Sequence, residues 1–194
     1  MNDIADAALL RLKKGNQRYA SGQSVNAITD AETRRSLVGS QQPFVAVLGC
    51  ADSRAIPELI FDAAIGELFA VRVAGNVINP QNNGSLEYAV EHLGVSLIVV
   101  LGHQNCGAVS ATLDNYDGPG HIQSITEAIS HAIDEVKDLP GDPLLNAVQG
   151  NARRMARLLR ATEPILSAAV AAGKLRIVPA YYDFGEGLVE FLDE

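Results

Sequence analysis

Apolar residues gather in short continuous runs that predict buried strands. Residues 44–49 (FVAVLG), 68–73 (LFAVRV) and 97–101 (LIVVL) are such runs, rich in valine and leucine. Runs of this kind are typical of parallel strands that are covered on both faces. Residues 175–182 (LRIVPAYY) predict a fourth strand, and residues 187–191 (GLVEF) predict a short antiparallel partner for it.

Apolar residues at three- and four-residue spacing predict helices before and between these strands. Residues 4–19 keep this spacing, and residues 26–37 predict a second, shorter helix. Both helices precede the first strand. Further helices are predicted over residues 83–93, ending at Gly94, over residues 108–113 and 122–136, and after Pro143, where Pro164 breaks or kinks a long stretch before Gly173.

Strands that alternate with helices predict an α/β fold, with a mostly parallel sheet flanked by helices. We expect a single domain over residues 1–194. Residues 1–40 would form an N-terminal helical arm, and residues 41–194 the sheet core with the C-terminal helices and strand. In sheets of this class, ligands bind beyond the carboxyl ends of the strands. The residues that follow those ends are therefore the first candidates for chemistry.

The charge of the chain narrows the class of protein. A formal charge of −8 argues against a nucleic acid or an anionic membrane as partner, because both require clustered basic residues. The one dense basic cluster has helical spacing and predicts a solvated helix face; it comprises Arg153, Arg154, Arg157 and Arg160. No apolar run reaches the length of a membrane span, and acidic residues precede the apolar ones at the N-terminus. We therefore expect a cytoplasmic protein.

Reactive side chains follow two of the predicted strands. Cys50, Asp52 and Arg54 come directly after the first strand, and His103 and Cys106 follow the third. Two cysteines are too few for a disulfide framework, and in a reducing compartment such a pair more often binds metal or does chemistry. Because parallel strands end at the same edge of a sheet and sequential strands are often neighbours, these side chains could converge.

Two thiolates and an imidazole form a strong ligand set for Zn²⁺. A fourth protein ligand would make the site structural, whereas a fourth position left to water would make it catalytic. Asp52 could coordinate the metal or lie just outside its ligands, and Arg54 offers a bidentate partner that would hold the carboxylate away. A structural zinc site remains an alternative. A thiol-dependent phosphatase is disfavoured, because its arginine would stand at Ile56.

These residues resemble the signature of the β-class carbonic anhydrases, Cys-x-Asp-x-Arg after one strand and His-x-x-Cys after a later one. The segments GELFAVRVAGN (66–76) and GSLEYAVEHLGV (84–95) strengthen the resemblance. The similarity runs from about residue 41 to residue 109 and resumes at residues 180–183. It implies the α/β fold of that family and a zinc enzyme.

The resemblance also implies roles for individual residues. Cys50, His103 and Cys106 would be the zinc ligands. Asp52 would accept a hydrogen bond from zinc-bound hydroxide, or bind the metal itself in a resting form, with Arg54 as its partner. The remaining matched positions would serve the substrate: Gln41 by hydrogen bonding, typically from the partner subunit, Phe69, Ala74 and Tyr88 as apolar pocket positions, and Gly107 as a backbone contact near the metal.

The implied activity is the reversible hydration of carbon dioxide to bicarbonate and a proton, by attack of zinc-bound hydroxide. The family forms dimers and larger assemblies in which N-terminal helices embrace the neighbour, so we expect a homodimer or a homotetramer. Hydrolysis of carbon disulfide or carbonyl sulfide on the same scaffold, and a non-catalytic zinc-stabilised module, are the alternatives. We expect no second, inhibitory bicarbonate site, because Val47 replaces the tryptophan that such a site uses and Arg72 alone is not enough.

Overall fold

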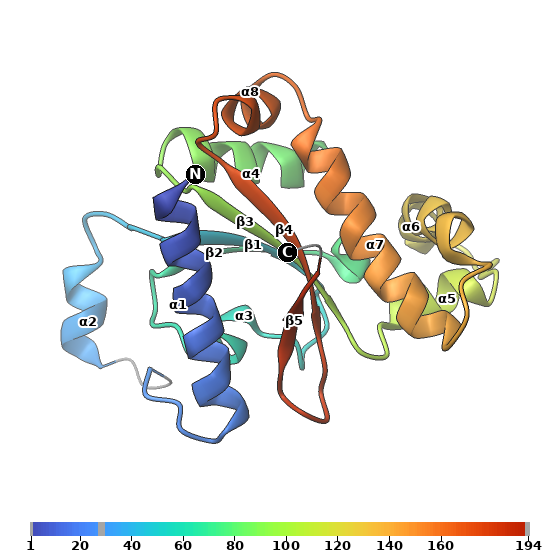
Figure 1. The fold of residues 1–194 in the computed structure, drawn as a ribbon, viewed down its shortest axis with the longest axis horizontal. Coiled ribbons are helices and arrows are strands. Elements are labelled where there is room, and N and C mark those ends of the chain that lie inside the picture. Colours follow the sequence, from blue (N-terminus) through green and yellow to red (C-terminus); the bar gives the residue numbers. More distant parts are fainter. Residues whose placement is uncertain (1, 27–29, 193–194) are drawn as a thin grey trace.

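The computed structural model describes residues 2–26 and 30–192 and has the predicted α/β fold. Its five-stranded sheet has the order β2-β1-β3-β4-β5 (Figure 1). The first four strands in chain order pair in parallel, and β5 pairs with β4 in the antiparallel sense, as predicted. The strands are β1 (Val45–Gly49), β2 (Leu68–Arg72), β3 (Leu97–His103), β4 (Arg176–Tyr182) and β5 (Val189–Phe191).

Helices connect these strands at nearly the predicted places. They are α1 (Asp3–Ala20), α2 (Ala31–Ser36), α3 (Pro57–Ile60), α4 (Pro80–Glu91), α5 (Gly107–Leu113), α6 (Ile122–Val136), α7 (Pro143–Arg160) and α8 (Ile165–Ala171), with a 3₁₀ turn η1 at Ala74–Asn76. The break predicted at Pro164 separates α7 from α8. Helix α4 begins three residues earlier than predicted, because Asn79 caps it and Pro80 suits its first turn.

The structure differs from the sequence-based expectations at two short helices. The helix expected over residues 26–37 is shorter: Asn26 is not helical, Asp30 caps α2, and residues 27–29 lie outside the described residues. Helix α3 was not predicted at all, because its four residues are too few to show a helical period. Both cases concern single-turn elements whose ends depend on local hydrogen bonds.

The two faces of the sheet carry separate cores. Along β3, Leu97, Val99 and Leu101 face a core that contains residues of α1 and α3, whereas Ile98 and Val100 face a core made with α4, α7 and α8. This alternation follows from the two-residue period of a strand. All seven residues of β3 are buried, which explains why its first five residues, 97–101, are all apolar.

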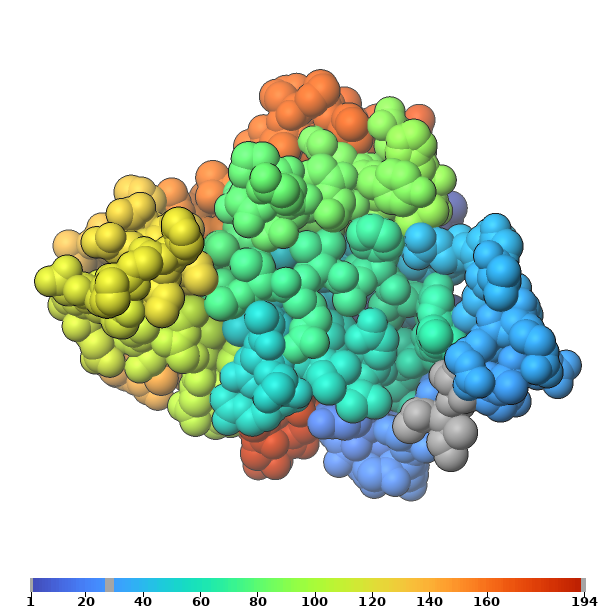
Figure 2. Space-filling model, turned by 180° about the vertical axis from the view of Figure 1, so that it is seen from behind, coloured from blue at the N-terminus to red at the C-terminus, as the bar shows by residue number. Residues whose placement is uncertain are grey.

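A third cluster of buried residues lies beyond the carboxyl ends of β1 and β3. It joins Cys50 and Cys106 to apolar residues of α5, α6 and α7, among them Val109, Ile129 and Val148. Helices α5 and α6 form a lobe at one side of the molecule, yellow-green to yellow in Figure 2, and α2 lies at the other side in light blue. The two cysteines are thus covered by the α5–α6 lobe.

The basic cluster on α7 is partly solvated, with Arg157 exposed, and it also makes specific contacts. Arg154 and Arg157 both bind Glu135 of α6, and Arg160 donates a hydrogen bond to the Ile177 carbonyl of β4. These arginines therefore tie three elements together. Among the residues that the structure describes, no helix combines the length and apolar character needed to cross a bilayer.

Candidate metal centre

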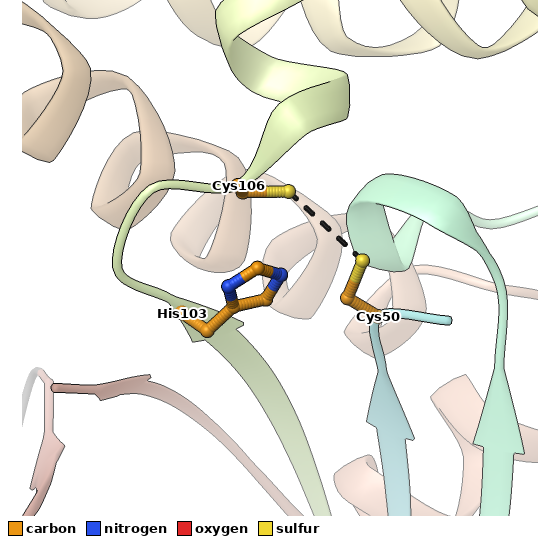
Figure 3. A group of neighbouring side chains, drawn as sticks. All are labelled: Cys50, His103 and Cys106. Atoms are coloured by element: carbon orange, nitrogen blue, oxygen red, sulfur yellow. Dashed lines mark hydrogen bonds between the residues drawn. The ribbon is translucent and has the colours of Figure 1, made fainter. Parts of the chain in front are cut away.

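Cys50, His103 and Cys106 come together at the carboxyl edge of the sheet, and their side chains point toward one another (Figure 3). Cys50 follows β1 directly, His103 is the last residue of β3, and Cys106 immediately precedes α5. Strands β1 and β3 are adjacent, so both chains leave the sheet side by side. One ligand atom from each residue lies within 4.8 Å of the other two, and we call these three residues the Cys–His–Cys cluster.

The turn between His103 and Cys106 brings the second cysteine back over the sheet. Asn105 has a φ of +52°, a left-handed conformation that asparagine tolerates better than most residues. The backbone N–H of Gln104 donates to the Tyr182 carbonyl at 2.8 Å, which holds the turn against β4. Cys106 then occupies the N-cap position of α5, and its side chain is buried within the cluster.

The Cys50 sulfur accepts two backbone hydrogen bonds. The N–H of Asp52 donates to Sγ at 3.4 Å and the N–H of Gly75 donates at 3.3 Å. Gly75 has a φ of +69°, and a Cβ there would lie 2.7 Å from Ile129 Cδ1. The left-handed backbone and this close approach both favour glycine here.

The two sulfurs lie 4.0 Å apart and share a hydrogen bond. This bond with Cys106, helped by the nearby backbone N–H groups, lowers the pKa of Cys50 to about 4 against the effect of burial. The same bond and burial raise the pKa of Cys106. The two sulfurs thus share one proton. A bound metal cation would displace this proton, because metals bind cysteine as the thiolate.

His103 is fully buried and presents one unused nitrogen to the sulfurs. Its Nδ1 lies 2.9 Å from the Gln104 carbonyl, so Nδ1 is the donor and Nε2 faces the cluster. Nε2 is buried and has no hydrogen-bond partner among the described residues. Burial lowers the pKa of His103, but Cys50 and the Gln104 carbonyl outweigh this and raise it. The surroundings therefore favour a positive charge at this point, and a metal cation that displaced the proton would supply it.

Asp52 lies beside the cluster but is held by Arg54. Its Oδ1 accepts from Arg54 Nε at 3.0 Å and its Oδ2 from Nη2 at 2.8 Å, a bidentate pair. Mainly through these bonds, the pKa of Asp52 falls to about 2. Oδ2 is 4.0 Å from His103 Nε2. The carboxylate is thus ionised and turned to the rim of the cluster.

Arg72 and Phe184, which were not predicted to belong to the site, support this arrangement. Arg72 donates from Nε to the Cys50 carbonyl at 3.0 Å and from Nη2 to the Asp52 carbonyl at 2.5 Å. The Phe184 ring lies 4.4 Å from the Arg54 guanidinium and its centroid 5.3 Å from that of His103. Arg72 could have been predicted to lie near the site, because it ends β2 and β2 pairs with β1. No sequence pattern places Phe184 near the cluster, because it is far from Cys50 and His103 along the chain.

The other matched positions divide into two groups. Ala74 directly precedes Gly75, and Gly107 directly follows Cys106, so both lie next to the cluster. Gln41 is exposed, and Phe69 contacts Tyr88 with ring centroids 6.4 Å apart. Phe69 pairs with Ala46, four residues before Cys50 along the neighbouring strand. Within one chain, the structure does not bring Phe69 and Tyr88 beside the cluster.

Comparisons with known proteins agree with this geometry. The sequence profile of the carbonic anhydrase family matches residues 45–189. Carbonic anhydrase 2 of Mycobacterium tuberculosis is 35% identical over 185 residues, which are 93% of this chain and 89% of that protein. The Coccomyxa β-carbonic anhydrase in complex with acetazolamide superposes with a TM-score of 0.76 at 32% identity, over 92% of this chain and 83% of the other.

A tetrameric β-carbonic anhydrase from Sordaria macrospora shares the fold. Its TM-score is 0.77 at 24% identity, over 93% of this chain and 94% of the other. The profile match spans most of the chain, and it includes both strand ends that carry the cluster. The chain therefore belongs to the β-carbonic anhydrases, zinc enzymes that hydrate carbon dioxide reversibly to bicarbonate and a proton.

Proposed function

We propose that Cys50, His103 and Cys106 hold the zinc ion of this carbonic anhydrase. The observation that carries this assignment is the buried, unpartnered Nε2 of His103, which faces two sulfurs within 4.8 Å. Two sulfurs and one nitrogen leave one position of a tetrahedral zinc site open. When bound, zinc lowers the pKa of water and so supplies a nucleophile at neutral pH.

Asp52 and Arg54 would prepare that nucleophile. While Arg54 holds both carboxylate oxygens, Asp52 stays ionised and outside the ligand set. Its Oδ2 can then accept a hydrogen bond from the attacking water and orient it toward the carbon of carbon dioxide. Without Arg54, the carboxylate would be free to turn into the cluster and become a fourth ligand, which would close the site.

A second copy of the chain would complete the substrate pocket. Strand β2 is an edge of the sheet, and beside it Tyr88 is 47% exposed and Phe69 partly exposed. Helix α2 has no buried residue and stands apart from the sheet in Figure 1. We propose a homodimer or homotetramer in which Gln41, Phe69 and Tyr88 of one subunit reach the cluster of another. The tetrameric Sordaria protein, which has the same fold, is consistent with this proposal.

We also propose that the chain works as one domain with residues 1–40 as an arm, and that it acts in the cytoplasm. Both cysteines are free thiols, as metal ligands must be, and a reducing compartment would keep them so. Ala74 and Gly107 would line the open position from the two loops that flank it. Nothing in the structure or the named relatives favours carbon disulfide or carbonyl sulfide as the substrate.

The experiment combines metal analysis with a stopped-flow assay of carbon dioxide hydration. We expect the wild type to bind one zinc ion per chain and to be active, and Cys106→Ala to lose both properties with its circular dichroism unchanged. Ser110→Ala, one turn further along α5, serves as the control and should keep both. A Cys106→Ala protein that retains zinc and full activity would contradict the assignment.

A further inference from the structure

A buried asparagine on α7 lies behind the Cys–His–Cys cluster. Asn151 has no exposed surface, and its Nδ2 donates to the Gly75 carbonyl at 2.8 Å. Its Oδ1 is also buried and has no hydrogen-bond partner among the described residues. An unpaired buried polar atom destabilises the fold, so packing of α7 alone does not account for an asparagine here. The neighbouring core positions of α7 are apolar, such as Ala152 and Met155.

Gly75 connects this asparagine to a proposed zinc ligand. Its carbonyl is held by Asn151, and its N–H donates to Cys50 Sγ at 3.3 Å. Glycine is the most flexible residue of a backbone, so the direction of its N–H depends on outside anchors. The anchor on the carbonyl side is Asn151, from a helix that lies 76 residues away in sequence.

We propose that Asn151 is a positioning residue for the zinc site, because it fixes Gly75 so that the Gly75 N–H stays on the Cys50 sulfur. This inference rests on the proposed role of Cys50 as a ligand. A hydrogen bond to a thiolate withdraws electron density from the sulfur and stabilises its anionic form. Groups that orient metal ligands in this way typically change metal affinity or activity about 10–100-fold when they are mutated.

The test compares two asparagines of the same helix. Asn151→Leu removes the amide and keeps a similar volume. Asn146→Leu is the matched control, because Asn146 also lies on α7 and its Nδ2 also donates to loop carbonyls, those of Leu139 at 3.4 Å and Pro140 at 3.1 Å. Both variants lose hydrogen bonds from a side-chain amide to the backbone, but only one of these bonds leads to the cluster.

Two readouts report on the cluster independently of activity. Chelator competition should show zinc binding about tenfold weaker in Asn151→Leu and unchanged in Asn146→Leu. In the cobalt-substituted proteins, the sulfur-to-metal charge-transfer band should move to lower energy in Asn151→Leu only, because the sulfur becomes a stronger donor. A folded Asn151→Leu protein with unchanged affinity and an unchanged band overturns the proposal.

A measurement on the wild type covers the case in which Asn151→Leu does not fold. In protein loaded with an NMR-active cadmium isotope, the amide protons of Gly75 and Asp52 should both show scalar coupling to the metal through Cys50. Coupling at Asp52 without coupling at Gly75 overturns the proposed role of Asn151. A wild-type cobalt protein without any sulfur-to-metal band would instead refute the ligand assignment itself, so the two failures are distinguishable.

Discussion

Two buried clusters of ionisable side chains, one at Asp62 and the other the Cys–His–Cys cluster, differ in whether their polar atoms have partners. Asp62, only 4% exposed, accepts hydrogen bonds from Arg18 Nε at 2.6 Å and from the N–H groups of Val25 and Asn26 at 3.0 and 2.9 Å. In the Cys–His–Cys cluster, by contrast, His103 Nε2 has no partner among the described residues. A complete buried cluster destabilises the fold when one partner is removed, whereas an incomplete cluster is suited to binding a ligand from solution.

The pKa shifts of the two clusters reflect the same difference. Burial raises the pKa of Asp62, but the bonds from Asn26, Arg18 and Val25 outweigh it and lower the pKa overall. The charge of Asp62 is therefore balanced within the chain. In the other cluster, Cys50 and Cys106 share a proton that a metal cation would displace. The Asp62 cluster is therefore complete without a ligand, whereas the Cys–His–Cys cluster is completed by a metal ion from solution.

The largest expected effect follows from His103→Ala. We expect zinc loss and a fall in kcat/KM for hydration of more than about 100-fold, since changes behind the ligands alone can reach that size. The metal-free variant should also lose stability, because the buried ring leaves a cavity and the Gln104 carbonyl loses its partner, partly offset by removal of the orphaned nitrogen. Stopped-flow assays and urea unfolding in chelator would measure both quantities. A His103→Ala protein that keeps zinc and full activity would contradict the ligand assignment.

Asp62→Ala should lower stability without loss of zinc. It leaves Arg18 and two backbone N–H groups without their acceptor, and breaking a buried pair costs about 3–5 kcal/mol. Because Arg18 is partly exposed, we expect the lower end of this range. Urea unfolding would measure the loss, and metal analysis of the folded protein should still find zinc. Loss of zinc in a folded Asp62→Ala protein would contradict the separation of the two clusters.

Arg54→Ala tests the Asp52–Arg54 pair. The two side chains satisfy each other's hydrogen bonds, and they lie beside the Cys–His–Cys cluster. We expect hydration activity to fall about tenfold or more while zinc remains bound, because Asp52 loses the partner that keeps it outside the ligand set. Activity assays and zinc analysis on the same preparation would show this. Lys174→Ala, at an exposed position between α8 and β4, is the control for removal of a positive charge. Full activity in Arg54→Ala would mean that Asp52 needs no partner.

The smallest expected effect is the pH dependence that Asp62 contributes. Its pKa in the folded protein lies below the ordinary value of about 3.9, so as the pH falls the unfolded state takes up the proton first. The stabilisation is therefore present above that value and is lost as the pH falls through the folded pKa. Urea unfolding of the wild type and Asp62→Asn from neutral to acidic pH should show a difference that shrinks in acid. A constant difference would mean that the pKa of Asp62 is not lowered.

Local patterns in the sequence were enough to predict most of the architecture. The apolar runs in β1 and in residues 97–101 of β3 are continuous because both faces of the sheet are covered, and that pattern can be read without coordinates. The proximity of Cys50 to His103 and Cys106 followed from one topological rule, that adjacent parallel strands end at the same edge. Both inferences use only neighbours in sequence or in strand order.

Contacts between distant segments could not be predicted in this way. The anchoring of Gly75 by Asn151, the packing of Phe184 on Arg54 and the completion of the Asp62 carboxylate by Arg18 join residues from separate elements. No periodicity records such pairs, because each depends on how whole helices pack against the sheet. Residue type and strand order thus identified the chemistry of the site, whereas the packing of helices around it established which polar atoms are satisfied and which remain open to a metal.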